Sequence, residues 1–144
     1  MSGLDKTNSD YNDLISIACK YARRGKEVQV LSPIHFKDPK YHDVFGALIG
    51  TEYYRKCPDL LVDGVFYEYE SYERPFEMEK IERMITRGAK QSSDIVIDIR
   101  ESSATKKVIN NKIQKLKRQK SFHNAIDSVW IYDGEKVEMV YKNK

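Results

Sequence analysis

Acidic side chains recur at short intervals between residues 59 and 70, where Asp59, Glu68 and Glu70 stand in or beside short strand-like runs. Carboxylates packed closely together repel one another unless a divalent cation, a basic neighbour or protonation of one acid neutralises them. Clustered carboxylate oxygens suit Mg²⁺ or Mn²⁺, which can activate water and stabilise charge on a phosphoryl group. The pattern therefore predicts a carboxylate site in which Asp59, Glu68 and Glu70 are catalytic and bind a divalent metal.

A two-residue turn is expected to position these acids. Asp63-Gly64 separates the runs 58–62 and 65–70, as is typical of a type I′ turn in a β-hairpin. Such a turn fixes the register and sets Asp59 opposite Glu68. Because side chains alternate along a strand, we expect Asp59, Glu68 and Glu70 on one face. The other face is expected to pack against the core, through Leu60, Val62, Val65, Tyr67 and Tyr69.

Basic residues follow the hairpin at helical spacing: Lys80, Arg83, Arg87 and Lys90. Their intervals of three and four place them on one side of a helix. Such a stripe beside acidic residues is typical both of a structural salt-bridge network and of a surface that binds the phosphates of a substrate.

A second basic segment lies further along, since residues 102–126 contain no acid. A lysine-rich helix face is usually only solvated, but beside an acidic site it is also compatible with binding a polyanion. Its cations are Lys106, Lys107, Lys112, Lys115, Lys117, Arg118 and Lys120.

The elements that must position these residues alternate between helix and strand. Helices are predicted from Ser9 or Asp10 to about 25, over about 41–49, from near Pro75 to about 88, and over 103–118. Strands are predicted at 26–31, 58–62, 65–70 and 94–99, and a second hairpin at 128–132 and 136–140, turned at 133–134. This order predicts an α/β (α+β) fold with a single mixed β-sheet flanked by helices. No repeat or linker interrupts it, so one domain over residues 1–144 is expected.

Composition narrows the class of protein. With 144 residues, 40% hydrophobic and 33% charged, the chain suits a soluble globular domain. No apolar stretch approaches the roughly 18–20 residues that span a bilayer, and the first residues lack the basic and apolar regions of a secretion signal. Cys19 and Cys57 have no metal-ligand spacing and are expected to be reduced thiols. We therefore expect a cytoplasmic location and no membrane partner.

A family resemblance joins these features. Pro58-Asp59, a turn, then Glu68-Tyr69-Glu70 followed by helix and strand, resembles the core of the PD-(D/E)XK nuclease superfamily. CPDLLVDGVFYEYES followed by IERMITRGAKQSSDIVIDI is similar to the C-terminal nuclease domains of bacterial contact-dependent inhibition and related polymorphic toxins. Those domains carry an NPD-hydrophobic-DG-x-x-x-E-x-K-S hairpin, then a helix and Lys-Gln before a strand that ends in Asp. The likeness covers roughly residues 57–100.

The resemblance implies a restriction-endonuclease-like core in which Asp59 and Glu68 match the acidic positions. It also matches Ser71 to the small residue after the motif, and Lys90, Gln91 and Asp98 to the helix-to-strand segment. Glu70 stands where the family has a lysine that orients or deprotonates the attacking water. Lys80, Arg83 or Lys90 could replace that lysine; alternatively, Glu70 is a third metal ligand or the site is inactive. On this reading Lys90 joins the catalytic residues, and Lys80, Arg83, Arg87 and Gln91 bind substrate.

The implied function is a small bacterial toxin nuclease that cleaves RNA in preference to DNA and has a cognate immunity protein. Other functions stay open. The chain could be a metal-independent ribonuclease of the barnase and EndoU-like group, with His42 and His123 as acid and base. It could also be a catalytically inactive module of the same fold that binds nucleic acid or another protein.

Overall fold

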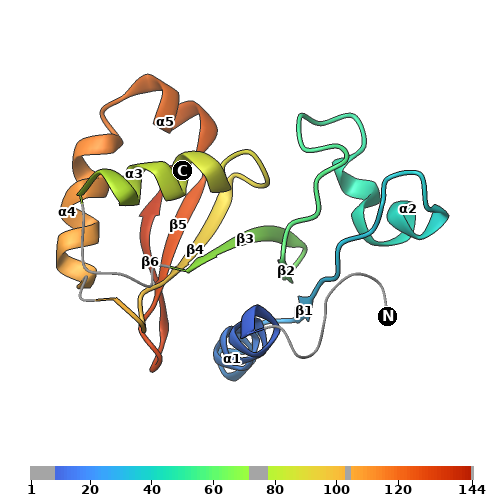
Figure 1. Ribbon diagram of the computed structural model, residues 1–144, viewed down its shortest axis with the longest axis horizontal. Helices are drawn as coiled ribbons and strands as arrows, with labels where there is room; N and C mark the ends of the chain where they lie inside the picture. Colours follow the sequence, from blue (N-terminus) through green and yellow to red (C-terminus); the bar gives the residue numbers. More distant parts are fainter. Residues whose placement is uncertain (1–8, 72–77, 103–104, 144) are drawn as a thin grey trace. The chain divides into compact units, whose positions relative to one another are not determined.

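The computed structural model describes residues 9–71, 78–102 and 105–143. Its elements are α1 (Ser9–Arg23), β1 (Val28–Val30), α2 (Pro39–Phe45), the 3₁₀ turn η1 (Gly46–Leu48), β2 (Leu60–Val62), β3 (Val65–Ser71), α3 (Met78–Gly88), β4 (Asp94–Asp98), α4 (Lys106–Leu116), α5 (Lys120–Ala125), β5 (Ser128–Tyr132) and β6 (Val137–Lys142). The strand order is β1-β2-β3-β4-β5-β6 (Figure 1). This arrangement confirms the predicted α+β class with one mixed sheet and flanking helices.

The chain divides into two compact units, residues 1–66 and 67–144, and each is described by itself. In the first unit, α1 lies against β1, which pairs antiparallel with β2 in the register Val28↔Val62. A separate apolar cluster forms around Leu31, Tyr41, Phe45 and Leu48. Both cysteines are free thiols.

The turn between β2 and β3 has the predicted type I′ conformation. Asp63 and Gly64 both have positive φ, 47° and 81°, as that turn requires. The Asp63 carboxylate accepts the backbone N–H of Glu27 (2.7 Å) and forms an ion pair with Lys26 (3.4 Å). Strand β1 begins two residues later than predicted because the N–H of Lys26 closes the end of α1 on Tyr21 (3.2 Å).

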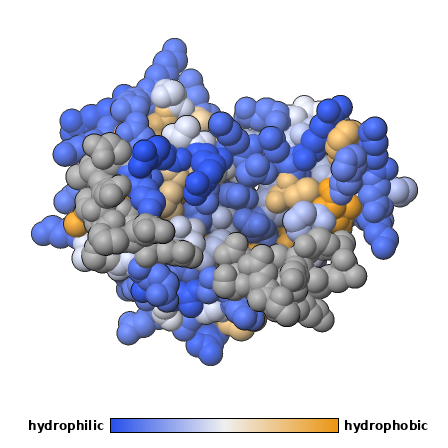
Figure 2. Space-filling model, viewed as in Figure 1, coloured by the Kyte–Doolittle hydropathy of each residue, from blue (hydrophilic) through white to orange (hydrophobic). Residues whose placement is uncertain are grey.

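In the second unit, β3, β4 and β5 run parallel and β6 pairs antiparallel with β5. Helices α3, α4 and α5 cover one face of these strands through a cluster that includes Ile85, Ile95, Ile97, Ile113 and Phe122. The outer surface of these helices is mostly hydrophilic (Figure 2). The helices thus cover one face of these strands. Side chains level with the buried isoleucines point toward the helices, and the residues between them point to the other face.

Alternation then assigns the acids of β3 to this covered face. Glu68 is level with Ile95 and Glu70 with Ile97, both of which belong to the helix-covered cluster. Tyr69 and Ser71 are level with Val96 and Asp98 and belong to the opposite face. The prediction that Glu68 and Glu70 share a face is therefore confirmed. The expectation that only the opposite face packs against the core was wrong, because the face of Glu68 and Glu70 is covered by helices while Tyr67 and Tyr69 on the other face are buried as well.

Some predicted boundaries were wrong or are untested. Helix α5 was not predicted, because KSFHNA is short and Phe122 is its one buried residue. The second hairpin is joined by a four-residue loop rather than a two-residue turn, since β5 ends at Tyr132 and β6 begins at Val137. The predicted helix starts near Pro75 and at 103 lie outside the described residues. Within the described part, no helix is long and apolar enough to cross a membrane.

Candidate functional site

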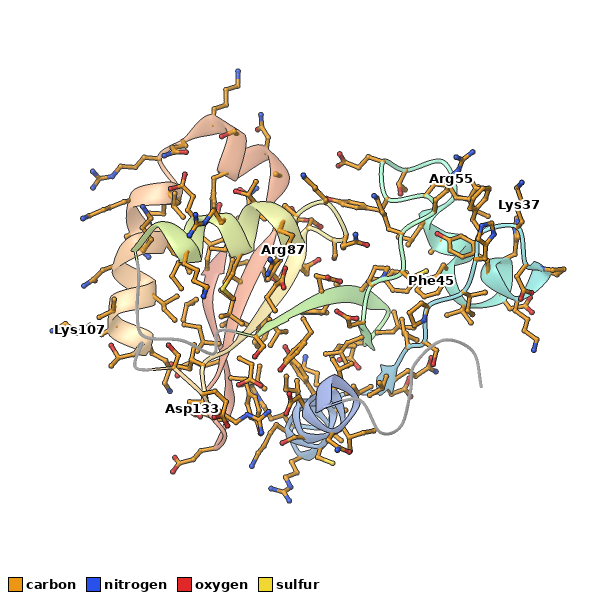
Figure 3. All side chains as sticks on the ribbon, in the orientation of Figure 1. Lys37, Phe45, Arg55, Arg87, Lys107 and Asp133 are labelled. Carbon is orange, nitrogen blue, oxygen red and sulfur yellow. The ribbon has the colours of Figure 1, made fainter. Side chains whose placement is uncertain are left out.

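Glu70 is a nearly buried carboxylate that is held by the guanidinium of Arg87. Arg87 Nε donates to Glu70 Oε1 (3.0 Å) and a terminal nitrogen donates to Oε2 (3.1 Å), which makes the ion pair bidentate. The Glu70 side chain is 11% exposed and that of Arg87 is 67% exposed. Figure 3 shows Arg87 between α3 and the strands. The sequence-predicted metal ligand Glu70 and substrate-binding residue Arg87 are thus each other's partners.

Gly88 allows α3 to approach the strands closely enough for this pair. A Cβ added at Gly88 would lie 3.2 Å from the Ile95 side chain and 3.6 Å from Glu70 Cγ. The hydrogen bonds from Arg87 to Glu70, and then the charge of Glu70, raise the pKa of Arg87. The charge of Glu68 raises it further, so both acids of β3 act electrostatically on the same guanidinium.

A shallow groove of about 470 Å³ runs along α3 beside this pair. Arg83, Arg87 and Lys90 line it, together with Glu82 and Thr86, so three of the four residues in the predicted stripe share one surface. The Glu82 carboxylate is paired with Lys112 of α4 (3.5 Å). The groove therefore presents mainly positive charge.

The other predicted substrate-binding residues lie apart from the groove lining. Lys80 is half-buried near the start of α3. Gln91 lies in the turn after α3, where its backbone N–H donates to the carbonyl of Gly88 (2.9 Å). Their contact with a substrate stays a prediction.

Asp59 belongs to the first unit, where it precedes β2. Its carbonyl accepts the N–H of Leu31 (2.9 Å), which continues the β1–β2 pairing by one hydrogen bond. Its pairing with Glu68 stays a prediction.

The described residues do not fit the predicted three-carboxylate metal site. Both oxygens of Glu70 accept hydrogen bonds from Arg87. Across residues 9–71, 78–102 and 105–143, no group of three or more His, Cys, Asp or Glu side chains is arranged to hold a metal ion. The metal dependence itself stays a prediction for a titration to decide.

A second buried carboxylate, Asp98, lies on the opposite face from Glu70. It is 3% exposed and accepts the Tyr69 hydroxyl (2.8 Å) and the Arg100 guanidinium (2.7 Å). Arg100 also lies over the Tyr132 ring, 4.8 Å from its centroid. The alternation of acids and isoleucines in DIVIDI is the sequence signal for this cluster, because the isoleucines had to face the helices.

Comparisons with known proteins place the chain among toxin domains. The family model of the contact-dependent growth inhibition CdiA C-terminal domain matches residues 56–137. No curated protein matches the sequence. A chain of the solved CdiA-CT/CdiI toxin and immunity complex from Burkholderia pseudomallei has a similar fold, with a TM-score of 0.62 and 15% identity over 99% of this chain and 94% of that one.

Proposed function

Because the chain belongs to the family of contact-dependent growth inhibition CdiA C-terminal domains, we propose that it is a toxin domain that cleaves phosphodiester bonds, in RNA rather than DNA. The family match confirms the resemblance to contact-dependent inhibition toxins. Cleavage and the preference for RNA are proposals, and the geometry of β3 and α3 supports them.

The observation that carries the proposal is an arginine that is anchored and exposed at once. Glu70 fixes Arg87 through two hydrogen bonds, while 67% of the Arg87 side chain stays open to solvent. A guanidinium held in this way keeps N–H donors for a phosphate, which it can bind without losing much side-chain entropy. Arg83 and Lys90 in the same groove add charge for the neighbouring phosphates. This surface suits the backbone of a nucleic acid.

The carboxylate of Glu68 is the best candidate for the general base. It is half-buried and shares its face of the strand with Glu70, and its charge raises the pKa of Arg87. In RNA, Glu68 would accept the proton of the 2′-hydroxyl, whose oxygen attacks phosphorus as the bond to the 5′-oxygen breaks. The departing oxygen takes a proton from water, and Arg87 neutralises the charge that develops on the phosphoryl oxygens. Because the nucleophile belongs to the substrate, this route favours RNA over DNA.

Asp59 and Lys90 complete the set of catalytic candidates. Asp59 matches the first acid of the family-like motif, and Lys90, in the turn that follows α3, lines the groove. We assign no step to a metal, since Glu70 is engaged with Arg87. A titration with Mg²⁺ or Mn²⁺ tests whether a cation that binds with the substrate increases the rate.

The decisive experiment compares Glu68→Gln and Asp59→Ala with Glu135→Gln, which changes an exposed glutamate in the β5–β6 loop. Purified proteins are incubated with total RNA and with DNA, with EDTA or with Mg²⁺. Loss of a general base should reduce the cleavage rate by about 10²–10⁴-fold, and Glu135→Gln should cleave like wild type. If wild type cleaves neither polymer under any condition, the enzyme proposal fails. Retained salt-dependent binding would then favour an inactive nucleic-acid-binding module.

We also propose a cognate immunity protein, since the structural neighbour comes from a complex of a toxin with its immunity protein. The cationic groove along α3 favours an acidic partner surface. Co-expression with the product of the adjacent reading frame should restore the growth of cells that produce the toxin in their cytoplasm. Growth arrest that persists although that product is soluble and abundant would contradict the assignment.

A further inference from the structure

A cleft of about 410 Å³ lies in the second unit, and none of its lining residues lines the groove along α3. It forms where the end of α4, helix α5 and the end of β6 meet. The polar residues that line it are Gln114, Lys117, Arg118, His123, Lys142 and Asn143.

Among the described residues, the cations of this cleft have no acidic partner, unlike Arg87 and Lys106 of the same unit. Lys117, Arg118 and Lys142 are exposed, and in the part of the chain that the structure describes none of them pairs with a carboxylate. By contrast, Arg87 is paired with Glu70 (3.0 Å) and Lys106 with Asp133 (3.0 Å). Three like charges around one hollow repel, and a bound anion relieves that repulsion.

The cleft is built on ordered contacts rather than on loose side chains. The Asn143 amide donates to the carbonyl of His123 (2.7 Å), which ties the chain after β6 to α5. The Phe122 and Tyr141 rings pack edge to face with centroids 5.1 Å apart. At the end of α4, the N–H of Lys117 donates to the carbonyl of Ile113 (2.9 Å). The backbone that carries the cations is therefore held in place.

The chemistry of the lining favours a phosphate backbone over a protein surface. Protein interfaces are anchored by exposed aromatic or aliphatic side chains at their centre. Here the lining aromatic residue, Tyr141, is only 8% exposed, so the cleft offers mainly amide and cationic donors. Burial first, and then the charge of Asp127, raises the pKa of Tyr141. Residues 102–126 contain no acid.

We propose that this cleft binds the phosphate backbone of a nucleic-acid strand, as a second phosphate site distinct from the groove along α3. The inference rests on the proposed function only in taking nucleic acid as the polymer. It gives the acid-free segment a role in holding substrate at a distance from the cleaved bond. Loss of the cleft should therefore weaken binding without removing the chemical step.

The test measures the binding of a 12-nucleotide 2′-O-methyl RNA, which lacks the attacking hydroxyl, by fluorescence anisotropy at several salt concentrations. The triple variant Lys117→Gln, Arg118→Gln and Lys142→Gln is compared with a matched control, Lys107→Gln, Lys115→Gln and Lys120→Gln. Both remove three exposed cations from the same unit. Each lost phosphate contact should lower the slope of log K against log salt by about 0.7, so the cleft variant should lose about 2 and the control far less.

Equal losses in the two triple variants would overturn the proposal, because net charge alone would then explain binding. It would also be overturned if the cleft variant bound the RNA like wild type but no longer bound the immunity protein. Urea unfolding followed by the fluorescence of Trp130 checks that each variant is folded. If wild type shows cleft-dependent binding but cleaves no RNA, the proposed function fails and this inference stands. If it cleaves RNA and the cleft variant binds unchanged, only this inference fails.

Discussion

The pairing of Glu70 with Arg87 predicts an asymmetric response to mutation. Arg87→Met removes the guanidinium and leaves a carboxylate that is only 11% exposed without its charged partner. Leaving a buried charge unpaired usually costs about 3–5 kcal/mol. Because the Arg87 side chain is 67% exposed, water can reach the site, and we expect a smaller loss of about 1–2 kcal/mol in the free energy of unfolding. That loss lowers the melting temperature by about 3–8 °C.

The companion substitution shows whether the loss arises from the unpaired acid. Glu70→Met in the Arg87→Met background removes the buried charge and leaves two apolar side chains of similar length. Replacement of both partners is often close to neutral, so the double variant should be more stable than Arg87→Met alone. The control is Arg83→Met, an exposed arginine one turn earlier on α3, whose effect should stay within about 0.5 kcal/mol.

Urea titration measures these free energies, and the fluorescence of Trp130, the only tryptophan, reports on the second unit. The four proteins wild type, Arg87→Met, Glu70→Met and the double variant form a double-mutant cycle. The reasoning is refuted if Arg87→Met changes stability no more than Arg83→Met does. It is also refuted if the two single effects add without an interaction energy.

Three further predictions concern other contacts. Burial raises the pKa of Asp133, but hydrogen bonds from the backbone of Lys136 and from the Lys106 side chain outweigh burial and hold the pKa at about 2. In urea titrations, wild type should therefore exceed Asp133→Asn in free energy of unfolding by the full amount at pH 5, and this difference should shrink as the pH falls below about 4. Burial raises the pKa of Asp94, so its charged form opposes folding: Asp94→Asn should gain stability relative to wild type as the pH rises from 3 to 7, and a loss over that range would contradict this sign. The Tyr41 hydroxyl accepts the N–H of Arg55 and donates to the carbonyl of Lys56, both at 2.9 Å. Tyr41→Phe should therefore lower the free energy of unfolding, measured by thermal unfolding, by about 1–3 kcal/mol. A change below about 0.5 kcal/mol would show that water replaces both hydrogen bonds.

Local sequence signals account for the parts of the fold that depend on neighbouring residues. Asp63-Gly64 predicts its turn because few residue pairs tolerate two successive positive φ angles. The spacing of Ile81, Met84 and Ile85 predicts α3, and the apolar run after Asp94 predicts β4. In contrast, α5 has few apolar residues and no side-chain cap, so nothing local distinguishes it from a loop.

The sequence predicted only part of the candidate site. Alternation along β3 is local, so the shared face of Glu68 and Glu70 followed from their spacing. The sequence did not identify the partner of Glu70. Helical spacing puts four basic residues on the same side of the helix and does not distinguish between them: Lys80, Arg83, Arg87 and Lys90. Which of them reaches β3 depends on how closely α3 approaches the strands, and Gly88 sets that approach.

The sequence by itself determined a carboxylate-bearing hairpin, a basic helix after it and an acid-free segment near the C-terminus. The tertiary structure alone decided that Glu70 is bound to Arg87, that Asp98 lies on the opposite face, and that Lys117 and Lys142 line one cleft. The physical reason is the separation in sequence between the interacting residues. Turn and strand preferences are set by backbone sterics within a few residues, whereas these partners are separated by 17 or more positions and meet only when helices pack on the sheet.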